Sequence, residues 1–198
     1  MAYPAVEAPS GLTPVNRLDG LPYAGATRTF KIASGYNTSI FNGDAVALVA
    51  GGTVEREAGS GTMSAVGIFV GCSYTDPTLG YKVHAQYFPA NLVADDIEAY
   101  VVDDRNVVFK VAVVSAGTTI GAVTQSAVGA NVELIDNAGD TATGKSAVAA
   151  SQTVATTAGH PFRVVDVVPE TANASGDFTE VLVIWNAGHQ YSNTTGIV

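Results

Sequence analysis

The stretch IEAYVVDDRNVVFKVAVV, residues 97–114, contains two runs rich in β-branched and aromatic residues, separated by four polar ones. Ile97–Val102 and Val107–Val114 have the length and composition of strands. The intervening Asp103-Asp104-Arg105-Asn106 has the composition of a turn. The stretch therefore predicts two strands joined by a tight connection, the basic unit of an all-β fold.

The same pattern extends outward in both directions. Apolar and polar residues alternate from Thr29 to Ile32, and GYNTSIFNGD then supplies turn residues. Further predicted strands are Ala45–Val49, Val66–Val70, Tyr81–Phe88, Val132–Ile135 and Thr179–Asn186. Helix is scarce, since only Pro89–Glu98 and Ser146–Ala155 could hold a short one. We therefore expect an all-β protein built from small barrel-like or sandwich-like units.

The second half of the chain resembles the first, in the same order. The similar pairs are Phe30-Lys31-Ile32-Ala33 with Phe109-Lys110-Val111-Ala112, Gly43–Val49 with Gly129–Ile135, Val66–Val70 with Phe162–Val168, and Tyr81–Phe88 with Thr179–Asn186. This predicts two similar β modules, residues 27–100 and 101–190, joined near ADDIEAYVVDD (94–104), with a C-terminal tail at 191–198. Chance similarity is the alternative, because such alternation is common in sheets.

Residues 1–26 lack a sustained period and contain several prolines, so we expect an extended N-terminal arm. Apolar and aromatic residues are spaced along it, which favours an arm that lies against another surface over a disordered one. The arm residues predicted to contact a partner are Tyr3, Pro4, Leu12, Val15, Leu21 and Tyr23.

Acidic residues outnumber basic ones by 18 to 9, which gives the chain a formal net charge of −9. Such a charge repels a phosphate backbone and an anionic membrane surface, so neither nucleic acid nor membrane is an expected partner. The one cysteine, Cys72, excludes an internal disulfide and indicates a small buried hydrophobe. No secretory signal and no apolar run of about 20 residues is present, so we expect a soluble protein.

Residues 139–146, GDTATGKS, match the phosphate-binding pattern G-x-x-x-x-G-K-[ST] at every fixed position. A working loop of this kind needs a parallel strand before it and a helix after it, and the following AVAASQTVATTAG is a poor helix. Asp140 also places a carboxylate where a polyphosphate would bind. We therefore expect a β-hairpin loop with no cofactor bound at Gly139, Gly144, Lys145 or Ser146, with the two glycines at positive φ and Lys145 in solvent.

No arrangement of residues predicts a catalytic or metal site. Asp95, Asp96, Glu98, Asp103 and Asp104 lack the spacing of a calcium loop and fit solvated turns, although a surface calcium ion is the alternative. The three histidines, His84, His160 and His189, have no metal-ligand spacing, and Trp185 fits a core position. We expect a protein that is not an enzyme.

Three segments, GYNTSIFNGDAVAL, VGIFVGCSYTDPTLGYKVHAQYFPAN and AYVVDDRNVVFKV, resemble a family of virion proteins of tailed bacteriophages, the head decoration or cement proteins. The resemblance covers about residues 20–188. It implies a β-rich, non-enzymatic protein, made in the bacterial cytoplasm, that binds the outer surface of the capsid. Its implied partners are the major capsid protein and further copies of itself, as a dimer or trimer. The alternatives are a neck, tail or fibre-base component, a carbohydrate-binding module, and a nucleotide hydrolase.

Overall fold

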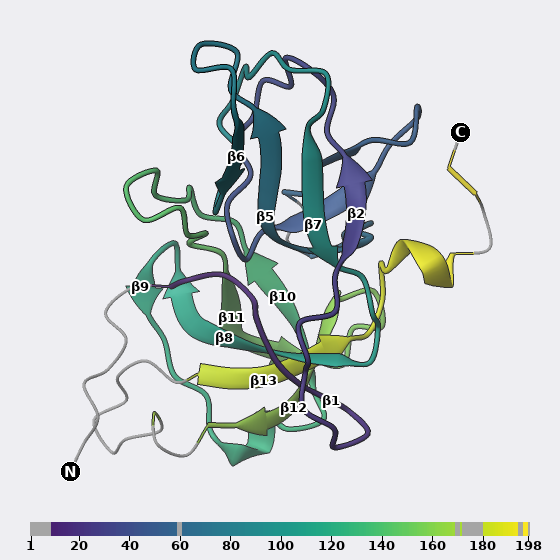
Figure 1. Cartoon of the computed structure of the whole chain (residues 1–198). Helices are drawn as coiled ribbons and strands as arrows, with labels where there is room; N and C mark the ends of the chain where they lie inside the picture. Colours follow the sequence, from purple (N-terminus) through teal and green to yellow (C-terminus); the bar gives the residue numbers. More distant parts are fainter. Residues whose placement is uncertain (1–8, 59–60, 169–170, 172–179, 194–195, 198) are drawn as a thin grey trace.

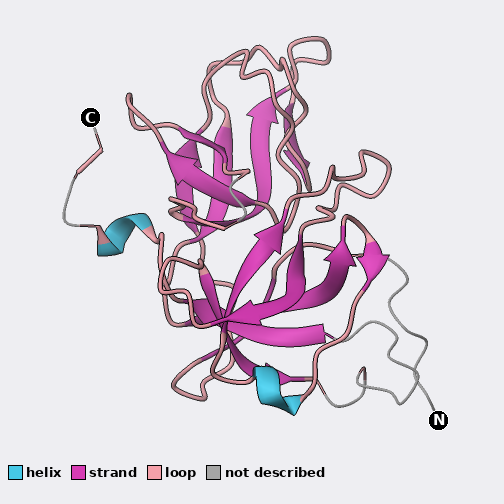
Figure 2. Cartoon of the chain, turned by 180° about the vertical axis from the view of Figure 1, so that it is seen from behind, coloured by secondary structure: helices cyan, strands magenta, loops and turns pink. Residues whose placement is uncertain are grey.

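The computed structural model of the 198-residue chain describes residues 9–58, 61–168, 171, 180–193 and 196–197. Strands and loops make up nearly all of the described chain (Figure 2). The helical turns within the described ranges are two short 3₁₀ segments, η1 (Gln125–Ala127) and η2 (Gln190–Ser192). The all-β prediction is confirmed.

Two sheets lie one above the other in Figure 1. The upper one, the first sheet, runs in the order β2-β7-β5-β3-β4, with β6 paired to β5. Its strands are β2 (Arg28–Lys31), β3 (Ala45–Leu48), β4 (Val54–Arg56), β5 (Gly67–Thr75), β6 (Lys82–Ala85) and β7 (Glu98–Val102).

The lower sheet closes into a five-stranded barrel, because β13 at the end of the path β8-β11-β10-β12-β13 also pairs with β8. β1 and β9 are additional partners of β8. The strands are β1 (Thr13–Arg17), β8 (Val107–Ala116), β9 (Thr119–Ile120), β10 (Asn131–Ile135), β11 (Ala149–Ala155), β12 (Phe162–Val167) and β13 (Glu180–Trp185).

The first sheet repeats the strand path of the barrel. Strands β2, β3, β4, β5 and β7 of the first sheet correspond, in chain order, to β8, β10, β11, β12 and β13 of the barrel. In both sets the order across the sheet is the first, fifth, fourth, second and third strand. The barrel closes through the parallel pairing of β8 with β11, and in the first sheet a single parallel bridge between Lys31 and Thr53 lies at the corresponding place. The prediction of two similar β modules is confirmed.

Registers show where the sequence alignment of the two halves is wrong. A register shift follows Phe69 in β5 and Val164 in β12, so Glu98 and Glu180 occupy equivalent positions. Phe30 then corresponds to Val111, two residues beyond the predicted Phe109. β13, which lies within the predicted strand 179–186, corresponds to β7 and not to Tyr81–Phe88, which contains β6. Although the sequence alignment pairs β2 with β8 two residues out of register, it still matches residues on the same face of the two strands, because side chains alternate between faces along a strand.

Neither predicted helix forms. Residues 89–97 lie in turns and loops before β7, and residues 149–155 form strand β11. Thr153 and Val154 are β-branched, which favours a strand once β8 and β10 supply partners on both sides.

Each sheet encloses an apolar core. In the barrel, the ring of Trp185 contacts Phe162 and Phe109, with ring centroids 4.4 and 6.5 Å away. In the first sheet, Phe69 and Phe88 are completely buried. The barrel core continues into the first sheet, since buried residues on both sides pack in one cluster: Ala45, Met63, Ala65, Ile68 and Val102 from the first sheet and its connections, with Leu12, Val107, Val132 and Trp185 from the barrel side. The two modules are therefore joined by apolar contact as well as by the chain.

Candidate functional site

Residues 139–146 connect β10 to β11, two antiparallel neighbours in the barrel. The chain turns back on itself here: the Asp140 N–H donates to the Lys145 carbonyl (3.0 Å), and the Gly144 N–H donates to the Asp140 carbonyl (2.8 Å). The chain then enters strand β11 instead of a helix. The hairpin connection is confirmed, and these residues do not form the strand–loop–helix geometry in which amides point at a phosphate.

The two glycines of this connection have different roles. Gly144 has φ 69°, as expected for a tight turn. The expectation of a positive φ at Gly139 is wrong; a side chain there is excluded because its Cβ would collide with the ring of Phe41. That ring stacks on Tyr87 with centroids 5.5 Å apart. The Lys145 side chain is exposed, as expected.

Ser146 ties the same connection to the first sheet. Its hydroxyl donates to Asp44 Oδ1 (2.6 Å), and both side chains are buried. The other oxygen of Asp44 accepts from the Phe41 N–H (2.9 Å) and from Arg56 Nε (3.0 Å). Arg56 in β4 also forms an ion pair with Asp136, at the end of β10. We call Asp44, Arg56, Asp136 and Ser146 the junction network, because it bonds the two modules together.

The junction network holds Arg56 charged. Burial acts to lower the pKa of its guanidinium, but the carboxylates of Asp44 and Asp136 outweigh that effect and raise it. Next to it, the Ser146 N–H donates to the Asn42 carbonyl (2.9 Å), so the backbone joins the modules as well. The arrangement is saturated with partners inside the chain, which suits a structural role.

Residues 186–193, the C-terminal strap, make a second tie. The strap leaves β13 of the barrel and crosses to the first sheet (Figure 1). There the Ala65 N–H donates to the Gly188 carbonyl (2.8 Å), and the Gln190 N–H donates to the Ala65 carbonyl (2.8 Å). The Gln190 side-chain amide bonds both backbone groups of Leu48, at 2.8 and 2.9 Å. The Gln190 side chain thus makes the two hydrogen bonds to Leu48 of β3 that the backbone of a neighbouring strand would make.

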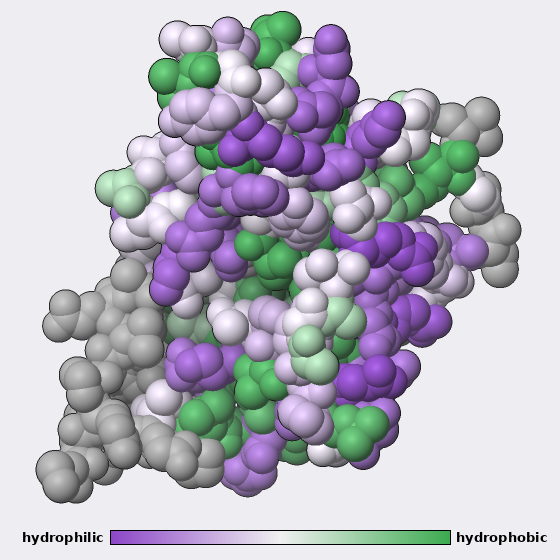
Figure 3. All heavy atoms as spheres, in the orientation of Figure 1, coloured by the Kyte–Doolittle hydropathy of each residue, from purple (hydrophilic) through white to green (hydrophobic). Residues whose placement is uncertain are grey.

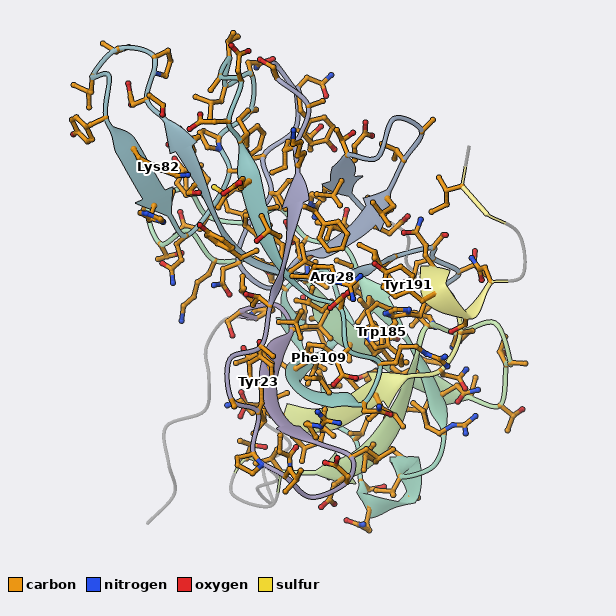
Figure 4. The ribbon with its side chains drawn as sticks, turned by 45° about the vertical axis from the view of Figure 1, so that its right-hand side comes forward. Tyr23, Arg28, Lys82, Phe109, Trp185 and Tyr191 are labelled. Carbon is orange, nitrogen blue, oxygen red and sulfur yellow. The ribbon has the colours of Figure 1, made fainter. Side chains whose placement is uncertain are left out.

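Aromatic and charged side chains gather beneath the strap, where Figure 4 shows Trp185, Tyr191 and Arg28 close together. The ring of His189 meets Trp185 edge to face at 5.0 Å and lies 5.5 Å from Tyr191. Arg28 from β2 lies over the Tyr191 ring and forms an ion pair with Asp103 at 2.9 Å. Residues from β2, β13, the β7–β8 connection and the strap thus meet at one place.

His189 is 1% exposed, and neither of its ring nitrogens has a hydrogen-bond partner among the described residues. Burial, followed by the positive charge of Arg105, lowers the pKa of His189 to about 4. Sequence reasoning assigned this histidine no role. It also missed Asp44, Arg56 and Asp136, because single charged residues far apart in sequence carry no spacing signal.

The predicted arm contacts fall into different environments. Tyr3 and Pro4 lie outside the described residues. Leu12 is completely buried in the barrel core, so its side chain packs within this chain and is not exposed for contact with a partner. Val15 and Leu21 are exposed, and Tyr23 is partly buried with its hydroxyl donating to the Ala26 carbonyl (2.9 Å).

An extended arm over residues 1–26 is not confirmed. Residues 13–17 form β1, which pairs with β8 in the lower sheet. Leu12 joins the barrel core and residues 13–17 pair with β8 of the same chain, which the sequence could not show. Exposed apolar side chains follow at the turn after β1.

Two groups of exposed apolar side chains lie at opposite ends of the molecule. The lower cluster consists of Val15, Leu18 and Leu21, on β1 and the turn after it. The upper cluster consists of Leu79, Tyr81 and Val93, in the β5–β6 and β6–β7 connections. Figure 1 shows β1 at the lower end and the β5–β6 connection at the upper end, and Figure 3 shows hydrophobic surface at both.

The acidic residues near 95–104 make local contacts. Asp96 accepts from the Thr75 N–H (2.8 Å), and this bond is the main cause that lowers the Asp96 pKa. Asp104 accepts from the Asn106 N–H (2.9 Å). In the described part of the chain, no group of three or more His, Cys, Asp or Glu side chains could hold a metal ion.

Cys72 has the environment that the sequence predicts. It is buried, and burial raises the pKa of its thiol to about 12. The thiol donates to the Tyr87 carbonyl (3.5 Å). A thiol in this state is a poor nucleophile, because the thiolate is the reactive form.

Comparison with protein-family models, with curated proteins and with solved structures gives no match for this chain. Within the described ranges, no helix has the length and apolar character needed to span a membrane.

Proposed function

We propose that this protein is a non-enzymatic head decoration, or cement, protein of a tailed bacteriophage. It binds the outer surface of the capsid, contacts the major capsid protein, bridges adjacent capsid subunits and stabilises the shell. Further copies of the protein are its second partner on the lattice.

The observation that supports this proposal best is the pair of apolar clusters at opposite ends of a molecule whose two modules are bonded to each other. Exposed apolar side chains that gather in a cluster mark surfaces for protein contact. The junction network and the strap bond the two modules to each other. A molecule with a contact surface at each end is suited to hold two neighbours together, and repetition over a lattice multiplies a weak single contact.

The charge of the chain supports an outward position. A net charge of −9 disfavours contact with packaged DNA and leaves the outer face of a shell as the better environment. Asp44, Ser146 and Cys72 are buried and hydrogen-bonded within the chain, as structural groups are.

The test is to image particles of the producing phage and to quantify this chain against the major capsid protein. We expect hundreds of copies on the outside of the head. A copy number of a few dozen would instead indicate a neck, tail or fibre-base component, and absence from particles would overturn the proposal.

Rebinding of purified protein to particles that lack it tests the two clusters. Leu18→Ser with Leu21→Ser, and separately Leu79→Ser with Val93→Ser, are each expected to weaken binding or stabilisation of the shell. Val128→Ser is the matched control, because Val128 is exposed but lies outside both clusters. Binding that all three variants retain would show that the clusters are not contact surfaces. Specific binding to a glycan array would favour the carbohydrate-binding alternative.

A further inference from the structure

The C-terminal strap is closely fitted to the first sheet. Gly188 has φ 77°, and a Cβ at this position would collide with the Met63 carbonyl. Four hydrogen bonds to Ala65 and Leu48 hold the strap in register. Because the strap continues directly from β13, its position determines whether the barrel and the first sheet are coupled at this side.

The ring of His189 is enclosed under the strap in its neutral form. Trp185 and Tyr191 supply ring contacts but no hydrogen-bond partner for either ring nitrogen. A neutral imidazole tolerates this enclosure, whereas burial penalises the charge of an imidazolium; the backbone groups of Asp103 and Val66 and the charge of Asp104 offset only part of that penalty. The enclosure therefore favours the unprotonated form of His189.

Charged and backbone groups from neighbouring elements act on this ring. The β7–β8 connection brings Arg105, whose charge opposes protonation, the charge of Asp104, which favours it, and the backbone of Asp103, which favours it together with the backbone of Val66. β2 brings Arg28, which engages the carboxylate of Asp103, and the strap itself brings Tyr191. Burial and the charge of Arg105 together exceed these favourable effects, so the pKa of His189 is lowered and the neutral ring is favoured.

We propose that the C-terminal strap is an acid-operated latch between the two modules. When His189 takes up a proton, its ring leaves the aromatic cluster and the strap detaches from Ala65 and Leu48, while both sheets remain folded. The junction network contains no histidine and keeps the modules attached. Acid thus loosens one of the connections between the two modules without unfolding the protein. This inference stands on the strap alone and does not depend on the proposed function.

Hydrogen exchange of the full chain between pH 7 and pH 4 tests the latch. After correction for intrinsic exchange, protection of the Ala65 and Gln190 amides is expected to fall on the order of 100-fold by pH 4, since each unit of pKa difference is worth a factor of ten. Trp185 is the one tryptophan of the sequence, so its emission maximum and acrylamide quenching report on the same event. Strand amides of β12 are expected to keep their protection.

His189→Phe is expected to remove the acid-induced change, because a phenyl ring fills the site without titrating. His189→Gln serves the same purpose if the phenyl variant does not fold. His84→Gln is the matched control, since His84 is exposed on β6, and it is expected to behave like the unaltered protein. The latch is refuted if strap and β12 amides lose protection together, or if the His189 variants keep the original pH dependence.

Discussion

Arg56→Met is the substitution that bears most directly on how the two modules are held together. The change removes the guanidinium but keeps a side chain of similar length. It leaves the Asp44 carboxylate buried, with hydrogen bonds from Phe41 and Ser146 but without a cation. Asp136 also loses its ion-pair partner.

The side chain of Asp44 is 1% exposed and that of Arg56 is 13% exposed, so solvent cannot replace the lost partner. Breaking a buried ion pair in this way costs about 3–5 kcal/mol of the free energy of unfolding. For a chain of this size that corresponds to a fall in Tm of about 6–20 °C. Urea denaturation followed by circular dichroism gives the free energy, and a thermal scan gives Tm.

The double variant Asp44→Asn with Arg56→Met distinguishes a buried charge from lost packing. With the carboxylate also gone, no charge remains unpaired, so the double variant is expected to be more stable than Arg56→Met alone. Lys145→Met is the matched control, because Lys145 is exposed, and it should change stability by no more than about 0.5 kcal/mol. A loss below about 1 kcal/mol for Arg56→Met, or a double variant that is less stable still, would refute this account of the junction.

Four further outcomes are expected. Burial lowers the pKa of His189 to about 4 from an ordinary value near 6.5, so the unfolded chain takes up this proton at a higher pH than the folded chain does. The contribution of His189 to the free energy of unfolding is therefore fully present above about pH 6.5, and the free energy falls by at most about 3 kcal/mol towards pH 4. Denaturation curves of His189→Phe should lack this pH dependence. Leu12→Ala should cost about 2–5 kcal/mol in urea denaturation, whereas Val15→Ala, at a 44% exposed position, should be nearly neutral; equal effects would contradict the assignment of Leu12 to the core. Gly188→Ala should lower Tm by straining the strap, and an unchanged Tm would show that the strap is not closely fitted. Mg-ATP should raise Tm in neither the unaltered protein nor Lys145→Ala, and a reproducible rise would restore the phosphate-loop hypothesis.

Which segments become strands followed from local chemistry. The runs at 97–102 and 107–114 alternate or cluster β-branched residues, and these properties act within a few residues of chain. The likeness between the halves found the order of three of the four compared strands, because corresponding positions in a repeated fold face similar surroundings. The hairpin at 139–146 was also predictable, since the helix that a phosphate loop needs could not form from AVAASQTVATTAG.

The sequence by itself determined the all-β class, most of the strands and most of the repeated strand order, because alternation and turn residues act locally. Only the tertiary structure decided which residues tie the modules together. Ser146 and Asp44 meet across 102 residues of chain, and His189 becomes buried because a strap from the barrel folds back onto the first sheet. Such contacts form when distant segments close on one another, and no local pattern records which partner a lone charge or a lone ring will find.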